Sequence, residues 1–320
     1  MLSLELFWIS IIGFCVFMYV LLDGFTLGIG ILNFILNKQD AKIALSAVLP
    51  TWDGNQTWLV LGAASLYGAF PKAFAILMAK LYFPLIFMVI CLLLRGVCLE
   101  FFLKAKSSNK WQKILGASSL IISINQGLIL GNFIEGFDYP FFNLFSILCG
   151  ISLPIGYVLL GATRLILKTA GSLRDNMYIL SKKLILCVLI AMFVVSITTP
   201  IVDSYVFEFW FNWHNIIFLI WLPIVTGLLF INLYFALKNK CDFRSFWLSV
   251  GLFICPYIGF IISLYPYLVP FELSFYECAA PESTLEFITI GAVILLPTLL
   301  SYTFYSYYIF RGKITENLSY

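Results

Sequence analysis

Long apolar runs, separated by short polar stretches, extend along the whole chain of 320 residues. A membrane-spanning helix needs about 20 mostly apolar residues. The pattern predicts nine such helices, over residues 6–36, 53–70, 73–103, 113–133, 142–167, 183–203, 214–237, 246–268 and 285–310. The 53–70 segment is the least apolar of these, which leaves a count of eight open. We therefore expect an all-α integral membrane protein of eight or nine transmembrane helices. It should form one polytopic domain over 1–320, with a first bundle at about 1–135 and a second at about 142–320.

Lysine and arginine fall mainly in alternate connections between the predicted helices. One set of connections holds 16 of the 19 basic residues, and the other set holds only Lys72. Basic residues mark the cytoplasmic connections of a membrane protein. The distribution predicts an N-terminus outside and a C-terminus in the cytoplasm. That arrangement needs an odd number of spans and favours nine.

Composition narrows the class of protein further. Hydrophobic residues make up 62% of the chain and charged residues 11%, which excludes an ordinary soluble globule and a disordered chain. The net charge of +3 is too small to indicate nucleic-acid binding. His214 is the only histidine, so the chain alone cannot supply two axial histidines to a haem or several imidazoles to a metal. We expect no catalytic residue, haem ligand or metal ligand in this chain, so any redox chemistry is either shared with a partner or absent.

Asp23 lies deep within the first predicted helix, about 20 Å from its cytoplasmic end at 1.5 Å per residue. A charge inside a span is expensive and marks a candidate functional residue. Burial favours the neutral form of this carboxyl, which could then take up and release protons. The alternative is a protonated aspartate that only bridges helices, since Gly24, Gly28 and Gly30 permit close backbone approach.

A second polar cluster opens the 53–70 helix. Thr51 is expected to cap this helix and Asp53 to lie in its first turn, where the helix dipole favours a carboxylate. That structural role does not explain Asn55, Gln56 and Thr57, which follow directly. The cluster is typical of a water-accessible mouth, here on the cytoplasmic side.

Three further polar positions have simple structural explanations. Glu100 and Lys104 have the spacing of a surface ion pair on one helix. Lys80 lies near the outer end of its helix and is expected to extend toward the interface. His214 falls among tryptophans in a predicted outer interfacial belt.

Three motifs, Leu22–Gly30, Trp52–Leu59 and Arg95–Phe101, together with the C-terminal segment Tyr308–Ile314, resemble subunit II of the cytochrome bd quinol oxidases. The resemblance implies a bacterial inner-membrane complex of the respiratory chain that oxidises quinol, reduces O₂ to water and takes protons from the cytoplasm. It implies that haems b and d lie in subunit I, with which this haem-free chain forms a heterodimer. Small single-helix accessory subunits and a structural quinone are also implied for some members.

By motif, the resemblance carries a cytoplasmic proton path onto Asp53, Asp23 and Glu100. The supporting polar cluster is then Trp52, Asn55, Gln56 and Thr57. Thr26 stands where the family usually has a second acid, so a two-acid arrangement in this helix is in doubt.

Two other functions fit the residues. The first is a secondary transporter of a small polar solute or ion, with Asp23 and Lys80 as its coupling pair. The second is a purely structural subunit whose three acids do not titrate during turnover.

Overall fold

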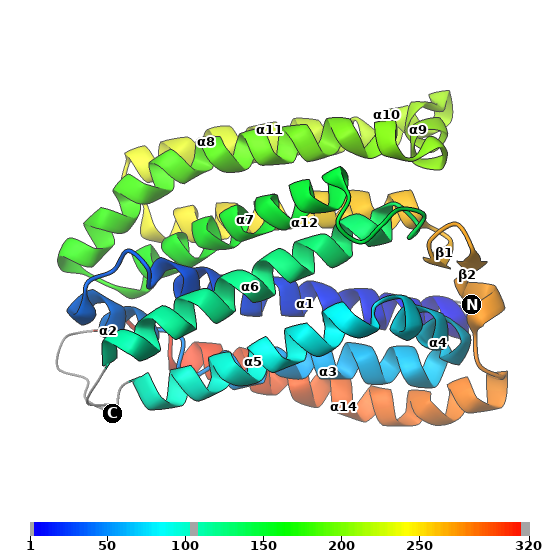
Figure 1. Cartoon of the computed structure of the whole chain (residues 1–320), viewed down its shortest axis with the longest axis horizontal. Coiled ribbons are helices and arrows are strands. Elements are labelled where there is room, and N and C mark those ends of the chain that lie inside the picture. Colours follow the sequence, from blue (N-terminus) through cyan, green and yellow to red (C-terminus); the bar gives the residue numbers. More distant parts are fainter. Residues whose placement is uncertain (1–2, 103–107, 315–320) are drawn as a thin grey trace.

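The computed structural model describes residues 3–102 and 108–314. Its long helices lie side by side along one common axis (Figure 1). The helices are α1 (Leu4–Leu32), α2 (Lys38–Ser46), α3 (Trp52–Ala69), α4 (Pro71–Lys80), α5 (Tyr82–Phe102), α6 (Ser108–Ile134), α7 (Leu144–Lys168), α8 (Gly171–Val202), α9 (Ser204–Phe211), α10 (Trp213–Leu219), α11 (Trp221–Lys238), α12 (Asp242–Leu264), α13 (Phe275–Cys278) and α14 (Glu282–Ile309). One antiparallel hairpin, β1 (Tyr267–Val269) and β2 (Leu273–Ser274), pairs Tyr267 with Ser274. The expected all-α membrane architecture is confirmed.

Eight helical stretches among the described residues are long and apolar enough to cross a membrane. The polar α3 is not one of them, but it runs along the same axis beside α1 and α14 (Figure 1). The start of α1 and the end of α14 lie at opposite ends of the bundle. Opposite ends require an odd number of passes, so α3 makes a ninth pass that apolar composition alone does not identify.

Two of the predicted spans are interrupted by proline. The predicted helix at 73–103 divides at Leu81 into α4 and α5, and the one at 214–237 divides at Ile220 into α10 and α11. Pro84 and Pro223 lie three residues after these breaks. Because proline has no amide hydrogen, the carbonyl four residues earlier loses its helical partner in each case.

The centre of the fold is α1, which packs against α3, α6 and α7. Gly28 meets α7 backbone to backbone, because a Cβ placed there would lie 1.8 Å from the carbonyl oxygen of Tyr157. Gly161 on α7 fits equally tightly, with its Cβ position 2.7 Å from the carbonyl carbon of Gly28. The expected close approach at the glycines of α1 is confirmed: α7 is the partner at Gly24 and Gly28, whereas the Cβ position of Gly30 lies 2.1 Å from Ser119 Oγ on α6.

Two long faces carry almost no packing within the chain. The most apolar stretch of α14 is only 6% buried and that of α10–α11 only 11% buried. Large apolar side chains cover these faces, including Phe218 and Phe304 at 79% and 74% exposure. Such surfaces suit lipid or another membrane subunit. The division into two bundles stays a prediction.

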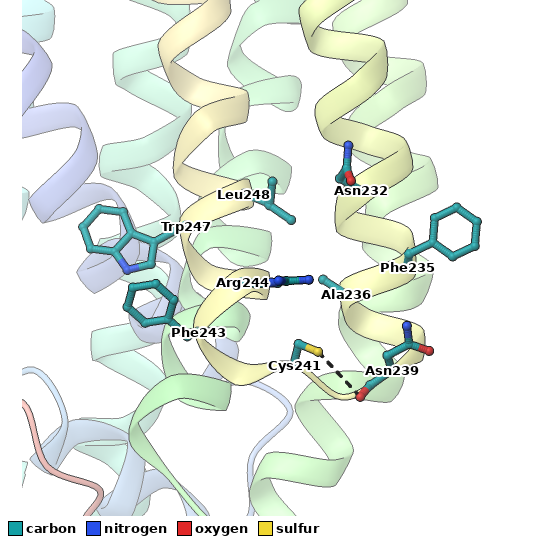
Figure 2. Close-up of a pocket in the computed structure, with 9 residues that line it drawn as sticks. All are labelled: Asn232, Phe235, Ala236, Asn239, Cys241, Phe243, Arg244, Trp247 and Leu248. Atoms are coloured by element: carbon teal, nitrogen blue, oxygen red, sulfur yellow. Dashed lines mark hydrogen bonds between the residues drawn. The ribbon is translucent and has the colours of Figure 1, made fainter.

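A pocket of about 400 Å³ lies between α11 and α12, close to the segment that joins them (Figure 2). It is lined by Asn232, Phe235, Ala236, Asn239, Cys241, Phe243, Arg244, Trp247 and Leu248.

Candidate functional site

Asp23 forms a buried ion pair with Arg95. Nη2 of Arg95 on α5 donates to Oδ1 of Asp23 on α1 at 2.8 Å, and the two side chains are 1% and 0% exposed. Asp23 Oδ2, Arg95 Nε and Arg95 Nη1 are buried without a hydrogen-bond partner among the described residues. Buried charges are normally paired, since an isolated one is very costly. Asp23 is therefore opposed by a full cation at the middle of the bundle. The sequence singled out Arg95 within a motif but did not predict this role.

Hydrogen bonds lead from Tyr19, a neighbour of Asp23, across the core to α6 and α7. Tyr19 lies one helical turn before Asp23 on α1, and its hydroxyl interacts with the Asp23 carboxyl. Gln126 Nε2 on α6 donates to the Tyr19 hydroxyl at 2.7 Å, and the Tyr157 hydroxyl on α7 donates to Gln126 Oε1 at 2.9 Å. The sequence analysis missed these three residues. An amide in the middle of an apolar helix, as Gln126 is, was the available signal.

Asn55 joins the polar cluster of α3 to α1 and α14. It is buried, and its Nδ2 donates to the carbonyl of Leu22 at 2.8 Å and to Thr26 Oγ1 at 3.4 Å. The hydroxyl of Tyr307 on α14 donates to Asn55 Oδ1 at 2.8 Å. Asn55 thus ties the seam between α3 and α14 to the backbone one residue before Asp23. Thr26 takes part in this contact in place of a second acid.

A small pocket opens at the same seam. Its lining residues come from α3, from α14 and from the residue before α3, and they are Thr51, Gly54, Asn55, Tyr302, Thr303, Ser306 and Tyr307. Most of these side chains carry a hydroxyl or an amide that can hydrogen-bond water. Thr51 is the N-cap residue of α3, as predicted, but its side chain makes no capping hydrogen bond, because its hydroxyl donates back to the carbonyl of Val48.

The other predicted site residues lie away from Asp23. Asp53 and Thr57 are exposed, because Asp53 lies two residues, or about 200°, from the inward-facing Asn55 on the helix. Glu100 is exposed near the end of α5, and its predicted partner Lys104 lies outside the described residues. The structure therefore brings Asn55 to the Asp23 helix, but neither Asp53 nor Glu100.

Two supporting residues of α3 are partly buried. Trp52 packs on α5, where its ring lies 3.3 Å from the Cβ position of Gly96. Gln56 is half-buried, and its Nε2 atom is buried without a hydrogen-bond partner in the described part of the chain.

Arg164 is a second buried cation and lies in an aromatic cage. Its guanidinium carbon is 4.9 Å from the ring centre of Phe25 and 5.2 Å from those of Phe246 and Tyr307. Cation–π contact can stabilise a desolvated guanidinium. The cage also fixes the ring of Tyr307, the residue that donates to Asn55. The sequence analysis assigned Arg164 only to a basic connection and missed this contact.

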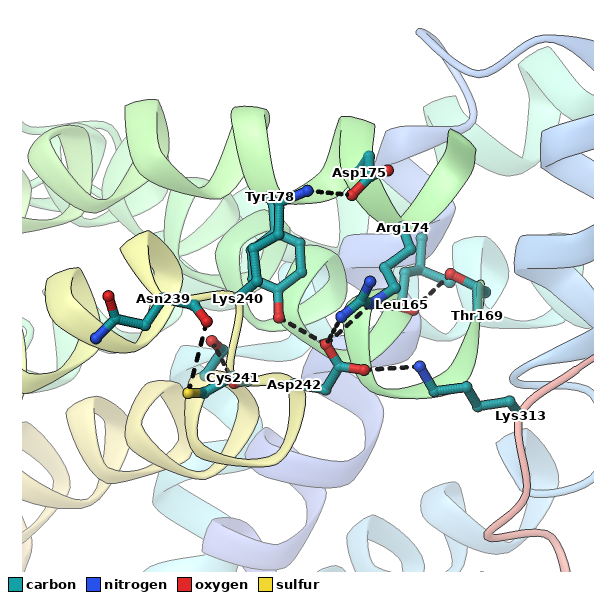
Figure 3. A network of polar contacts seen from close by, with 11 residues as sticks. Leu165, Thr169, Arg174, Asp175, Tyr178, Asn239, Lys240, Cys241, Asp242 and Lys313 are labelled. Atoms are coloured by element: carbon teal, nitrogen blue, oxygen red, sulfur yellow. Dashed lines mark hydrogen bonds and ion pairs between the residues drawn. The ribbon is translucent and has the colours of Figure 1, made fainter. Parts of the chain in front are cut away.

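Asp242 anchors a polar cluster at the end of the bundle where α14 ends (Figure 3). Arg174 donates to Asp242 Oδ1 through Nε at 2.9 Å and Nη2 at 2.6 Å, and the Tyr178 hydroxyl donates to the same oxygen at 2.6 Å. Lys313 binds Oδ2 at 2.7 Å. The cluster therefore joins the starts of α8 and α12 to the segment after α14. It escaped sequence analysis because its members lie far apart in the chain.

Lys168 fixes the same segment after α14. Its Nζ donates to the carbonyls of Phe310 and Gly312, and its own carbonyl accepts from the Ile314 amide at 2.8 Å. The end of α14, and with it Tyr307, is thereby tied to α7.

Lys80 is the last residue of α4, a helix that contacts β1 at the other end of the bundle (Figure 1). Its ammonium pairs with Glu272 and lies 5.1 Å from the ring centre of Phe137. The expected extension toward one end of the bundle fits this position. Asp23 pairs with Arg95 instead, so the structure does not bring together the Asp23–Lys80 pair that a transporter would need.

Cofactor-binding groups are sparse in the described part of the chain. His214 is exposed in α10, and the eight cysteines are free. Residues 3–102 and 108–314 contain no group of three or more His, Cys, Asp or Glu side chains that could hold a metal ion.

Comparisons with known proteins place these features in context. Residues 4–310 match the family model described as cytochrome bd terminal oxidase subunit II. The probable cytochrome oxidase subunit 2 of Haemophilus influenzae is 26% identical, over 97% of this chain and 93% of that protein. The cytochrome bd ubiquinol oxidase subunit 2 of Bacillus subtilis is 23% identical, over 99% of this chain and 98% of that protein. The solved structure of bd oxidase from Geobacillus thermodenitrificans has the same fold, with a TM-score of 0.81, 17% identity, and coverage of 96% of this chain and 98% of that one.

Proposed function

The chain belongs to the cytochrome bd terminal oxidase subunit II family, and from that premise we propose that it supports a haem-bearing subunit I and conducts protons toward it. The family is part of an oxidoreductase complex, so this chain acts as an enzyme subunit rather than as a transporter. Reduction of O₂ to water consumes protons, and a low-dielectric bundle needs titratable side chains and water to deliver them.

The observation that carries the proton role is the connection between the α3–α14 seam and the Asp23–Arg95 pair. Asn55 spans the distance, since it accepts from Tyr307 at the seam and donates to Leu22, the neighbour of Asp23. Neither the Asn55 amide nor the Leu22 carbonyl can relay a proton, so in this proposal water held by Tyr307 and Asn55 at the seam carries the proton to Asp23. The cation of Arg95, 2.8 Å from Asp23, opposes the effect of burial on this carboxyl, so in this proposal Asp23 alternates between its protonated and its charged form.

In this scheme Asp53 is the first carboxylate and Asp23 the inner relay. Asp53 lies in the first turn of α3 and faces outward, where it can exchange protons with bulk water or meet the partner subunit. Glu100 is also exposed and, like Asp53, would exchange protons with bulk water or meet the partner subunit. Trp52, Gln56 and Thr57 surround this start of α3 and complete the polar supporting cluster.

Three Asp→Asn variants of the assembled complex test the proton role. Asparagine keeps the shape of aspartate but cannot carry a proton. Asp23→Asn should lower haem-normalised oxygen consumption by about 100-fold, the low end of what a positioned proton-transfer group contributes. Asp53→Asn should lower it less, because water can replace an exposed group. Asp175→Asn is the matched control, since Asp175 is an exposed carboxylate that forms an ion pair with Lys240.

Proton uptake in the same variants, followed by time-resolved electrometry, separates the alternatives. Slower uptake at normal haem content supports the relay. If assembly falls but the haem-normalised rate stays at wild type, the acids are structural. An equal loss in a step without proton transfer, such as O₂ binding, would also exclude the relay.

The complex is proposed to lie in a bacterial inner membrane with the Asp242 end of the bundle in the cytoplasm. The basic connections support this orientation. Single cysteines at positions 108 and 138, in a background without the native cysteines, test it with an impermeant reagent on intact cells. Position 138 should label from outside and position 108 should not; the reverse pattern would invert the topology.

Haems b and d are proposed to reside in subunit I, and a quinone or small accessory subunits could join the complex as in some family members. The single exposed His214 supports a haem-free role. The chain expressed without subunit I should show no stoichiometric haem absorbance. Stoichiometric b- or d-type bands in that sample would contradict the assignment.

A further inference from the structure

We propose that the pocket between α11 and α12 binds the phosphate headgroup of one anionic phospholipid. The pocket lies outside the proton path and is open beside α10–α11, the stretch with only 11% burial. Its volume of about 400 Å³ is within the range of small-molecule sites.

The walls and the end of the pocket differ in chemistry. Phe235, Leu248 and Trp247 give apolar walls along the two helices, where acyl chains can lie. Asn239 and Arg244 supply the polar groups near the helix connection. Figure 2 shows Arg244 extending from α12 toward Ala236 on α11. A polar head at the helix ends and an apolar body along the helices are what a lipid presents at the edge of a bilayer.

Charge at the pocket favours an anion. Arg244 is exposed and has no ion pair or hydrogen-bond partner in residues 3–102 and 108–314. The nearest carboxylate in sequence, Asp242, is already held by Arg174, Tyr178 and Lys313. It therefore leaves Arg244 free to form a charge-assisted bond with a phosphate oxygen.

Native mass spectrometry of the purified oxidase complex tests the proposal. The probes are phosphatidylglycerol, phosphatidylcholine of the same chain length, and inorganic phosphate. The wild-type complex should retain one phosphatidylglycerol in preference to phosphatidylcholine. Arg244→Gln should weaken that retention by about tenfold or more, as expected for the loss of a hydrogen bond to a charged group.

Lys238→Gln is the matched control, because Lys238 is exposed at the same end but does not line the pocket. It should retain the lipid as wild type does. Equal retention in Arg244→Gln, or equal loss in Lys238→Gln, would overturn the site. Three other outcomes would also contradict the proposal. Equal binding of phosphatidylcholine would show that the pocket contacts lipid without recognising its headgroup, and binding of inorganic phosphate alone would show an anion site that takes no lipid. Recovery of a quinone from the pocket would show that a quinone, and not a phospholipid, occupies it. None of these outcomes requires a change in turnover, so the test is independent of the proton role.

Discussion

Arg95 Nη2 and Asp23 Oδ1 lie 2.8 Å apart between side chains that are 1% and 0% exposed, and they join α5 to α1 across 72 residues of sequence. Removing one partner of such a pair leaves the other charge buried and unpaired. Arg95→Met should therefore destabilise the complex by about 3–5 kcal/mol. The double variant Asp23→Asn/Arg95→Met should be less destabilised than the sum of the two single variants. Denaturant unfolding of the four complexes measures the coupling, and additive effects would show that the two side chains do not interact.

Gly28 is the position where α1 and α7 approach most closely. Alanine there would place its Cβ 1.8 Å from the Tyr157 carbonyl oxygen, and backbone cannot move aside as a flexible side chain can. Gly28→Ala should separate the two helices and cost more than about 3 kcal/mol, beyond ordinary overpacking. Because Tyr157 lies on α7, a shift of this helix should also weaken the hydrogen bond from Tyr157 to Gln126.

Gly227→Ala is the matched control for Gly28→Ala. Apart from the nearby backbone of its own helix, no atom of residues 3–102 and 108–314 lies within 4 Å of a Cβ at Gly227, although it too is a glycine within a helix. Alanine there should be neutral or stabilise the helix by about 0.5–1 kcal/mol. Thermal unfolding of both variants in the assembled complex is the measurement. Similar midpoints for the two would mean that the α1–α7 contact is looser than the structure indicates.

Glu135 provides a pH dependence outside the membrane-spanning helices. Burial raises the pKa of this carboxyl, and hydrogen bonds from Asn143 and Ser146 only partly oppose the rise. For an acid with a raised pKa in the folded state, the free energy of unfolding is highest below the unfolded pKa of about 4.3, where the group is protonated in both states. It falls as pH increases toward the folded pKa and is constant above that.

Glu135→Gln should remove this penalty while keeping an oxygen that can accept from Asn143. The variant should unfold at a higher temperature than wild type at pH 7, and the difference should disappear below about pH 4. Thermal unfolding of both complexes from about pH 3 to about pH 8 measures the difference. A constant difference across this range would mean that Glu135 does not titrate in the folded protein.

The helices could be predicted from sequence because membrane insertion depends on local apolar length. The breaks at Leu81 and Ile220 also have a local signal, because a proline follows each of them. The apolar pattern alone does not reveal these breaks, since it continues through them. The outward direction of Asp53 relative to Asn55 follows from helix geometry alone and was open to prediction. By contrast, the partners of Asp23 could not be predicted. Arg95 meets it only because α1 and α5 have a particular register, and no spacing in the chain encodes that register.

Tyr307 provides the most direct test of the seam between α3 and α14. Its hydroxyl donates to Asn55, and its ring packs on Arg164, so Tyr307→Phe removes the hydrogen bond and keeps the cation–π contact. The loss of one such bond costs about 1 kcal/mol. If the seam carries protons to Asp23, uptake should slow by about fivefold, the rate equivalent of that energy. Stopped-flow or electrometric proton uptake at fixed haem content is the measurement.

Tyr302→Phe is the control for this prediction, because Tyr302 lines the same seam pocket but is 57% exposed and lies one to two turns earlier on α14. It should leave uptake unchanged, since it does not contact Asn55 through a hydrogen bond in the described residues. Slower uptake in both variants would point to a general loss of seam packing. Unchanged uptake in Tyr307→Phe would mean that protons reach Asp23 by another route. Protons taken up by the exposed carboxylates of Asp53 and Glu100 would then have to reach Asp23 through the partner subunit.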